Sequence, residues 1–356
     1  MYKGILFLIC WVCLIIQPLY AGDGPNKPIT NVNVHIYGPQ KVGSLPAVSV
    51  PPDNPQSTLK ILLGKQLYFD TRLSKDNTIS CATCHDPSMG WSDAGPTSSG
   101  ISGQKGGRRA PPVSNAAYLP LQFWDGRAPS LEEQAKGPIA NPIEMGNTHD
   151  VMLRTVNDIP GYVEEFKTVF GTTLVTIDQV AQAIAAFERT VVTTDSPFDR
   201  YANGDESALT CQGKQGLEIF NGKGHCTACH WGPNFTDGRF HNIGVKPQDP
   251  NKVDQGRYEI TKDPKERGAF KTPTVRDASL RAPYLHDGSE KSLESLVEFY
   301  NRGGDTKDPD LDPLIVPLGL SQGEKDALVA FMKRAMMSTN PEVANVIPIP
   351  PTELPK

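Results

Sequence analysis

The sequence predicts a mainly α-helical, loop-rich fold in which one structural unit occurs twice. Two similar segments, LGKQLYFD at 63–70 and QGKQGLEIF at 212–220, each precede a cysteine motif. Two later segments, at 180–191 and 324–335, both repeat apolar residues at helical spacing. Glycine and proline number 32 each among 356 residues, which indicates many turns. An internal duplication is the simplest explanation of this repeated order.

The length of the chain suits about two domains, on a prior of one domain per ~100–200 residues. A polar segment with turn-forming residues, SPFDRYANGDES at 196–207, separates the two copies, and we place the boundary near Gly204. An extended arm without helical periodicity precedes the first copy, and a proline-rich tail follows the second. The predicted arm, first domain, second domain and tail are residues 22–57, 58–203, 204–340 and 341–356.

The N-terminus has the features of an export signal. Lys3 precedes an apolar run from Ile5 to Ile16, and small residues occur around Leu19, Ala21 and Gly22, with cleavage predicted after Ala21. The alternative is a membrane anchor, but the apolar run is shorter than the ~20 residues that span a bilayer. We therefore expect residues 1–21 to be a signal peptide and the mature protein to lie in the periplasm without a membrane span.

The charge pattern excludes two classes of partner. The net charge is −5, and acidic and basic residues are interspersed along the chain. No cationic stripe is present that could bind nucleic acid or anionic lipid. Neither nucleic acid nor a membrane surface is therefore an expected partner.

Four cysteines of the mature chain form two CxxCH motifs, CATCH at 81–85 and CTACH at 226–230. Two cysteines at this spacing reach the vinyl groups of one porphyrin, and the adjacent histidine then points at the iron. The motifs predict two covalently bound c-type haems, with His85 and His230 as proximal ligands. The thioether cysteines are Cys81, Cys84, Cys226 and Cys229.

Other interpretations of these motifs fit less well. A zinc site needs two further ligands at matching spacing, and a CxxC redox pair does not need the histidine. The fifth cysteine, Cys211, is interpreted as a small apolar residue. Function then depends on the sixth position of each iron, because an electron carrier fills both positions and an enzyme leaves one open.

Long segments of the chain resemble the bacterial dihaem cytochrome c peroxidases and their relative MauG. The resemblance lies in LGKQLYFDTRLS at 63–74, QFWDGRAPSLEEQAKGPIANPIEMGN at 122–147, GPNFTDGRFHNIGV at 232–245 and FKTPTVRDASLRAPYLHDG at 270–288. It implies two mostly helical, cytochrome c-like domains. Haem 1 would react with hydrogen peroxide, and haem 2 would be its redox partner.

The resemblance also assigns roles to four residues. Trp124 matches the tryptophan that lies between the haems and conducts charge, whereas taken alone it would more often be a packing residue. Gln134, Pro138 and Glu144 match the distal pocket of haem 1, although by spacing alone Gln134 and Glu144 would be surface residues. Cleavage of the peroxide O–O bond needs a group that takes and returns a proton. We expect Glu144 to be that group and Gln134 to orient peroxide or water.

Two departures from the family pattern concern iron ligands. Many family members cap haem 1 with a loop histidine, and Ile101 in SSGISGQKG at 98–106 stands at its position. Isoleucine cannot bind iron, so haem 1 is expected to be open in the oxidised protein. Tyr300 lies fourteen residues beyond His286, where ordinary family peroxidases have a methionine ligand of haem 2 and MauG has a tyrosine ligand. Its alternative role is packing on the apolar face of the helix at 292–300.

The sequence gives less information about calcium binding and about the roles of the remaining histidines. The resemblance implies a calcium ion between the domains, held partly by an asparagine side chain, but Arg109 in RRAP stands at that position. A cation beside a guanidinium is unfavourable, so the sequence leaves calcium binding open. The other histidines are interpreted as structural: His35, His149, His225, His241 and His286.

Two functions remain as hypotheses. The first is a MauG-like enzyme that uses peroxide to oxidise a residue of a separate protein, and Ile101 with Tyr300 favours it. The second is a cytochrome c peroxidase that takes electrons from a small cytochrome c or a cupredoxin. A dihaem electron carrier is a third and weaker reading, because it requires a sixth ligand on haem 1 and we identify no donor.

Overall fold

The computed structural model describes residues 45–193, 195–249, 251–306, 308–338 and 354–356, all within one compact unit. The predicted signal peptide, His35, most of the predicted arm and most of the predicted tail lie outside the described residues. No helix formed by the described residues is both long and apolar enough to cross a bilayer.

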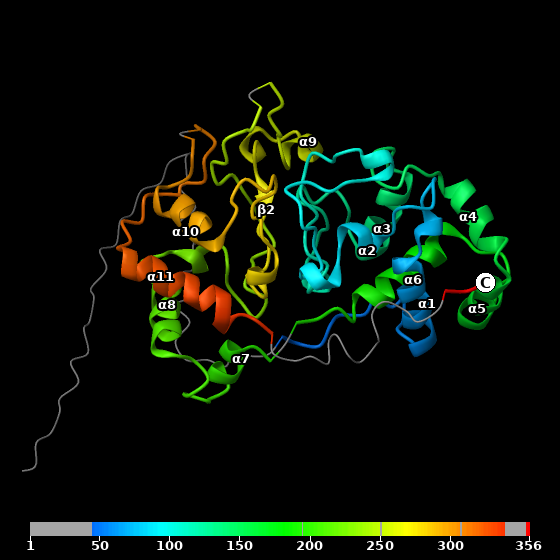
Figure 1. The fold of residues 1–356 in the computed structure, drawn as a ribbon, viewed down its shortest axis with the longest axis horizontal. Helices are drawn as coiled ribbons and strands as arrows, with labels where there is room; N and C mark the ends of the chain where they lie inside the picture. The colour runs from blue at the N-terminus through cyan, green and yellow to red at the C-terminus, as the bar shows by residue number, and fades with distance from the viewer. Residues whose placement is uncertain (1–44, 194, 250, 307, 339–353) are drawn as a thin grey trace, which may run out of the picture. The chain divides into compact units, whose positions relative to one another are not determined.

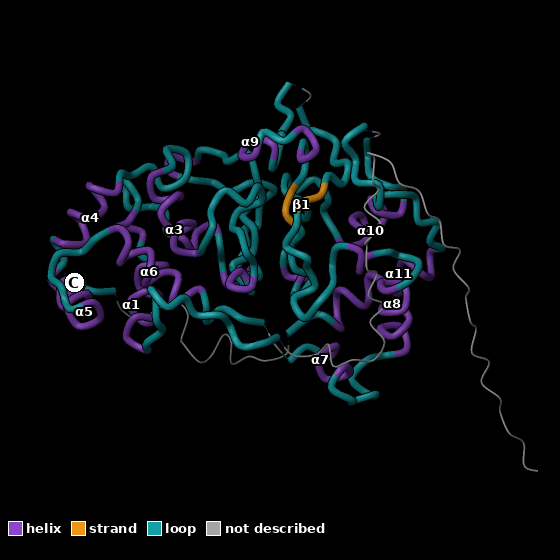
Figure 2. Tube along the Cα trace, turned by 180° about the vertical axis from the view of Figure 1, so that it is seen from behind, coloured by secondary structure: helices purple, strands orange, loops and turns teal. Residues whose placement is uncertain are grey.

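The described chain is mainly helical, as predicted (Figure 1). Two short strands, β1 (Phe240–His241) and β2 (Phe270–Lys271), pair antiparallel with Phe240 opposite Lys271 (Figure 2). Helices of the first half are α1 (Thr58–Phe69), α2 (Cys81–Cys84), α3 (Leu131–Ala140), α4 (His149–Asn157), α5 (Pro160–Phe170) and α6 (Ile177–Glu188). Those of the second half are α7 (Pro197–Ala202), α8 (Cys211–Asn221), α9 (Tyr258–Thr261), α10 (Leu293–Asn301) and α11 (Gln322–Ala330).

In the first half, α1 and α6 pack against each other with their backbones in close approach. The Ser57 side chain caps α1 by accepting a hydrogen bond from the backbone N–H of Lys60. A Cβ atom at Gly64 would lie only 1.7 Å from the carbonyl oxygen of Ala183, so no side chain fits between the helices here. The contact between α1 and α6 therefore holds the start of the segment that follows α1 beside α6, the last helix of the first half.

The second half repeats this arrangement with α8 and α11. A Cβ atom at Gly216 would lie 2.1 Å from the carbonyl oxygen of Ala327. The letters GKQ, common to both segments, would pair Gly64 with Gly213. The atoms nearest to Gly213, however, belong to Thr210 and Leu209. The helix contact therefore aligns Gly64 with Gly216, a correspondence that the shared letters do not give.

Each half has its own hydrophobic core. The first cluster contains Tyr68 and Phe187 among residues from 63 to 191, and the second contains Phe220 and Phe331 among residues from 198 to 336. Phe198 on α7 already belongs to the second cluster. The predicted boundary near Gly204 stays a prediction.

A turn that leads into a helix occurs in both halves with the same backbone geometry. Phe123 and Leu285 both have positive φ angles, 66° and 71°, which are uncommon for such side chains. Isolated bridges flank each of them, between Gln122 and Ala128 and between Tyr284 and Glu290. The two turns are thus equivalent.

The helices that follow these turns, α3 and α10, begin in the same way. Ser130 caps α3 and Ser292 caps α10, each by accepting a hydrogen bond from the N–H group three residues later. The eighth residue of α3 is Pro138, and the eighth residue of α10 is Tyr300. Pro138 and Tyr300 therefore occupy equivalent positions in the two halves.

The described ends of the chain lie along the first half. Residues 45–57 form neither helix nor strand, and the buried Asn54 side chain donates a 2.7 Å hydrogen bond to Glu132. At the other end, the Arg72 side chain donates to the carbonyl oxygen of Pro355 at 3.0 Å. The C-terminus accordingly lies beside α5 (Figure 1).

Candidate functional site

The first CxxCH motif lies in the wall of a cavity of about 570 Å³, which we call the first cavity. Cys81 and Cys84 lie on α2, and His85 follows at its end, with its backbone N–H bonded to the carbonyl of Cys81 at 3.0 Å. Burial lowers the pKa of His85, so the imidazole is neutral at neutral pH. Its Nδ1 is buried beside the carbonyls of Trp91 and Pro111 without a well-formed hydrogen bond to any described residue.

The second motif lines another cavity, of about 210 Å³, which we call the second cavity. His230 Nδ1 donates a 3.0 Å hydrogen bond to the carbonyl oxygen of Phe235. This bond leaves the lone pair of Nε2 free, and burial lowers the pKa of the ring. A neutral imidazole whose other nitrogen bonds a carbonyl is the usual state of a metal-ligating histidine.

The donor set fits a haem at each cavity. Burial raises the pKa of Cys84 to about 11 and that of Cys226 to about 12, so both are neutral thiols at neutral pH. Each cavity brings apolar side chains together with the two thiols and the neutral imidazole of its CxxCH motif, which is what a covalently attached haem requires. The described residues therefore accommodate the group that the motifs predict.

Another ligand cluster involves the second motif. Atoms of Cys229, Asp237 and His241 lie within 4.8 Å of one another and could hold a metal ion. The two nitrogens of His241, however, hydrogen-bond to Asp237 at 2.9 Å and to Asp312 at 2.6 Å. The two carboxylates raise the pKa of His241 to about 12 against the effect of its burial, so the ring is a cation at neutral pH. A doubly protonated imidazole has no lone pair for a metal.

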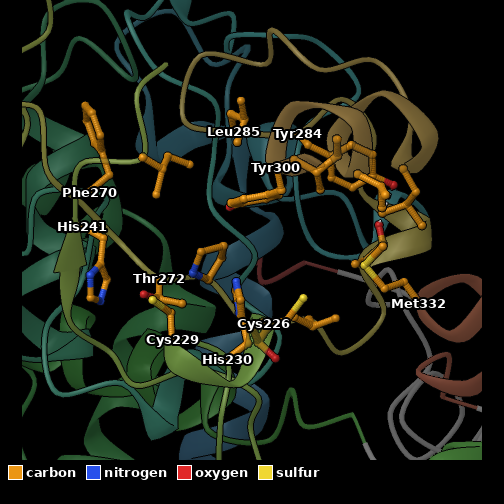
Figure 3. Close-up of a pocket in the computed structure, with 18 of the residues that line it drawn as sticks. Cys226, Cys229, His230, His241, Phe270, Thr272, Tyr284, Leu285, Tyr300 and Met332 are labelled. Atoms are coloured by element: carbon orange, nitrogen blue, oxygen red, sulfur yellow. Dashed lines mark hydrogen bonds between the residues drawn. The ribbon is translucent and has the colours of Figure 1, made fainter. Parts of the chain in front are cut away.

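Tyr300 lies across the second cavity from the CxxCH residues. Figure 3 shows Cys226, Cys229 and His230 on one side of this space and Tyr300 on the other. Burial raises the pKa of the Tyr300 phenol well above its ordinary value, so without a nearby cation the group is neutral. A ferric iron is a cation that would stabilise the phenolate.

One methionine also lines the second cavity. Met332 is buried and belongs to the second hydrophobic cluster, on the chain that continues α11. Tyr300 is not a member of that cluster and faces the cavity together with His230. The placement of Tyr300 is compatible with the ligand role that the sequence predicts.

The structure brings the three predicted distal residues together at the first cavity. Gln134 and Pro138 come from α3, and Glu144 comes from the turn that follows it. Burial raises the pKa of Glu144, while Arg127 and a 3.0 Å hydrogen bond from Asn141 act in the opposite direction. A carboxyl with a raised pKa can exchange a proton near neutral pH.

Ile101 does not line the first cavity. Its backbone N–H bonds to the carbonyl of Glu144 at 2.8 Å, and its side chain packs into the first hydrophobic cluster against Gly146. Among the described residues that line this cavity, Met145 is the one methionine, and it belongs to the same hydrophobic cluster. The loop around Ile101 thus offers the cavity no iron ligand.

Trp124 lines both cavities. Its Nε1 donates a 2.8 Å hydrogen bond to the carbonyl of Arg109, and its own carbonyl accepts one from the backbone of Lys271, also at 2.8 Å. Its ring meets that of His286 edge to face at 6.5 Å. These contacts hold the indole in the wall that the two cavities share.

Arg109 is buried at the same wall, where its guanidinium donates hydrogen bonds to carbonyl oxygens of both halves. The acceptors are Asp93 and Gly95 on one side, and Arg281 at 3.2 Å and Ala282 at 3.3 Å on the other. Carbonyl oxygens are also typical calcium ligands, so the guanidinium occupies groups that a cation could use. Calcium binding stays an open prediction.

Sequence reasoning gave no special role to two titratable groups that line the cavities. His241 was interpreted as structural, yet it lines the second cavity between two carboxylates. Glu188 on α6 lines the first cavity, its Oε2 is buried without a partner among the described residues, and burial raises its pKa to about 8. A charged residue on the otherwise apolar face of a predicted helix was the available signal for Glu188.

Of the remaining described histidines, one lies outside both cavities and two line the second cavity. His149 hydrogen-bonds to the carbonyl of Lys136 at 3.0 Å, outside both cavities. His225 and His286 line the second cavity. The ring of His286 stacks on Phe270 at 3.6 Å, and burial lowers its pKa to about 4.

The fold and the two cavities define a class of helical proteins with two haem-binding centres. The chain belongs to the dihaem cytochrome c peroxidase family, whose model matches residues 58–207. It is 42% identical to the methylamine utilization protein MauG of Methylorubrum extorquens, over 92% of this chain and 93% of that protein. It is 46% identical to the cytochrome c551 peroxidase of Nitrosomonas europaea, over 67% of this chain and 72% of that protein.

A solved structure has the same fold. It is a MauG-like protein associated with microbial copper homeostasis, with a TM-score of 0.77 and 30% identity over 83% of this chain and 94% of that chain. The predictions of a dihaem protein and of a haem peroxidase are confirmed by these relatives. MauG proteins and cytochrome c peroxidases both occur among them.

Proposed function

We propose that the protein is a MauG-like enzyme in which hydrogen peroxide reacts at an open haem 1 in the first cavity. Oxidising equivalents then pass through Trp124 to haem 2 in the second cavity and on to a protein substrate. The equivalence of Pro138 and Tyr300 carries this proposal. The helix position that offers a phenol to one cavity offers a side chain without donor atoms to the other.

The haems would be attached through Cys81 and Cys84 in the first cavity, and through Cys226 and Cys229 in the second. His85 and His230 would be the proximal ligands, and their neutral state supports this. The bound haems supply O–O bond cleavage and storage of oxidising equivalents. The rest of the proposal concerns what the protein side chains do.

At haem 1, Gln134 orients the incoming peroxide, and Glu144 takes a proton from one oxygen and returns it to the other. Asn141 holds the Glu144 carboxylate through their 3.0 Å hydrogen bond. The raised pKa of Glu144 supports this role, because its protonated and ionised forms are then closer in free energy at neutral pH.

Tyr300 decides the second part of the proposal. A phenolate is a hard anionic ligand that stabilises oxidised iron, whereas a methionine ligand raises the potential and favours reduced iron. A centre with a phenolate is thus suited to hold an oxidising equivalent until a protein substrate arrives. The 42% sequence identity to the MauG of M. extorquens supports this interpretation.

The alternative function is reduction of peroxide with electrons from a small cytochrome c or a cupredoxin. The similarity to the N. europaea cytochrome c551 peroxidase favours it. It needs a haem 2 that accepts electrons readily, which Tyr300 as a ligand would oppose. Steady-state turnover with reduced cytochrome c therefore separates the two functions.

We also propose that the chain consists of two cytochrome c-like domains that arose by duplication and meet near Gly204, and that it works in the periplasm. The paired helices, the separate cores and the repeated turn support the duplication. The predicted signal peptide supports export.

Electron paramagnetic resonance of the fully oxidised protein tests the proposal. We expect one high-spin ferric haem, which is haem 1 with its open position, and one low-spin haem. The high-spin signal should change as soon as peroxide is added. Two low-spin haems, with peroxide reactivity only after partial reduction, would contradict the open site.

A further inference from the structure

A third cavity, of about 290 Å³, lies next to the first, and we call it the entry cavity. Five residues line both the entry cavity and the first cavity and so form the wall between them: Phe123, Arg127, Pro138, Asn141 and Glu144. The other residues around the entry cavity include the exposed Pro129, Glu133 and Gly137. The entry cavity thus extends from the surface to the predicted distal side of haem 1.

A stacked pair stands in the wall between the two cavities. The Arg127 guanidinium lies 3.5 Å from the centroid of the Phe123 ring. Arg127 also donates two hydrogen bonds to the buried Asp125, at 3.0 and 2.9 Å. Asp125 is held in turn by Arg108 at 2.6 Å. The position of the stack is therefore fixed by charge-assisted bonds behind it.

We infer that the entry cavity is the route by which peroxide reaches haem 1, and that the Phe123–Arg127 stack restricts this route to small peroxides. The inference rests on the proposed open haem 1. Glu144 lies where the two cavities meet, so an entering peroxide would contact the predicted proton shuttle on arrival. Large organic hydroperoxides would be held back at the stack.

Gly137 provides a way to close the route. It is an exposed residue of α3, and a Cβ atom built on it would contact the Phe123 ring at an ordinary 3.5 Å. A leucine side chain at this position would project into the entry cavity without a backbone clash. Replacing glycine inside a helix also favours the helix itself.

The test measures cyanide binding and the peroxide reaction of the oxidised holoprotein by stopped-flow absorbance. Gly137→Leu should slow association of cyanide by roughly tenfold or more, as expected when the entry barrier rises. Cyanide dissociation should slow by the same factor, so the dissociation constant should not change. A route affects both directions equally, whereas a residue that stabilises the bound ligand changes its affinity.

Arg127→Ala is the opposite change, because it removes half of the stack. It should raise the rate with cumene hydroperoxide relative to the rate with hydrogen peroxide by roughly tenfold or more. The ratio is the measured quantity, because loss of the Arg127 charge also raises the pKa of Glu144 and so affects both reactions alike. The matched control is Arg302→Ala, which removes an equally exposed guanidinium from above Phe299 in the second half. Gly323→Leu, at an exposed glycine of α11 with nothing within 4 Å, is the control for Gly137→Leu.

The measurements separate failure of the entry route from failure of the proposed open haem 1. If cyanide binds haem 1 but Gly137→Leu and Arg127→Ala behave like their controls, the entry route is refuted and the open haem 1 stands. A changed cyanide affinity with an unchanged association rate would also refute the route. If the oxidised wild-type protein binds no cyanide, the open haem 1 fails, and the entry route fails with it.

Discussion

Pro138 and Tyr300 are the eighth residues of two helices that begin after equivalent turns, and each lines the cavity of its own half. One has a phenol that can bind iron, and the other has no donor atom. Two halves with the same local backbone thus differ in whether this position can offer an iron ligand. This asymmetry is what the proposed function requires, with one haem open to peroxide and the other fully ligated.

We expect Tyr300→Met to keep both haems and the fold, because methionine can bind iron and fills a similar apolar space. The variant should lose oxidation of a protein substrate and gain turnover with reduced cytochrome c, since methionine favours reduced iron. Absorbance should show a methionine-to-iron band in the variant alone. If the wild-type protein already shows that band and turns over rapidly with cytochrome c, the alternative function is correct.

The haems should be attached covalently. Acid–acetone extraction is expected to leave both haems on the protein, because thioether bonds resist this treatment while axial ligation does not. Intact-mass measurement should show two haems in the wild type and one retained haem after Cys226→Ser with Cys229→Ser. Release of most of the haem from the wild type would overturn the assignment of the CxxCH motifs.

Glu144→Gln should slow the reaction of the oxidised protein with peroxide by roughly 10²–10⁴-fold if Glu144 moves the proton. In the wild type, the rate should fall as the pH drops through the pKa of Glu144, because the first step needs the ionised carboxylate. Burial raises that pKa, so the fall should begin above the ordinary range of a glutamate. Glu164→Gln, at an exposed residue of α5, is the control, and an equal rate in both variants would exclude Glu144.

Glu188 should make the protein less stable as the pH rises. Burial raises the pKa of its carboxyl from 4.5 to about 8, so between these values the folded state holds a proton that the unfolded state has lost. Stability therefore falls with pH across this window. Glu188→Gln removes this ionisation. The difference in denaturant midpoint between the variant and the wild type should therefore be more favourable to the variant at pH 8 than at pH 5. A pH-independent difference would show that Glu188 ionises normally.

Arg109 should make the contact between the two halves independent of calcium. Its guanidinium bonds carbonyl oxygens from both halves, so chelation with EGTA should leave the unfolding midpoint unchanged. Arg109→Ala should lower the free energy of unfolding by roughly 1–3 kcal/mol or more, because buried carbonyls lose their donor. Arg334→Ala, at an exposed residue, is the control. A large shift with EGTA in the wild type would show that calcium binds after all.

The sequence determined the parts of the site that depend on local spacing. Cys81, Cys84 and His85 lie within five residues, and so do Cys226, Cys229 and His230, so their shared chemistry is encoded without knowledge of the fold. The closing helix of each half was also predictable, because apolar residues recur at helical spacing at 180–191 and at 324–335.

Tertiary structure alone decided which distant groups meet. His241 needs Asp312 to become a cation, Arg109 needs the carbonyls of Arg281 and Ala282, and Trp124 lines two cavities at once. No local pattern encodes such contacts, because they arise where separate segments pack together. The equivalence of Pro138 and Tyr300 is of the same kind, since it rests on backbone turns that different side chains adopt alike. Spacing along the chain could specify the cysteines and the proximal histidine that would hold each haem. Packing between distant segments decided which residues lie on the opposite side of each cavity.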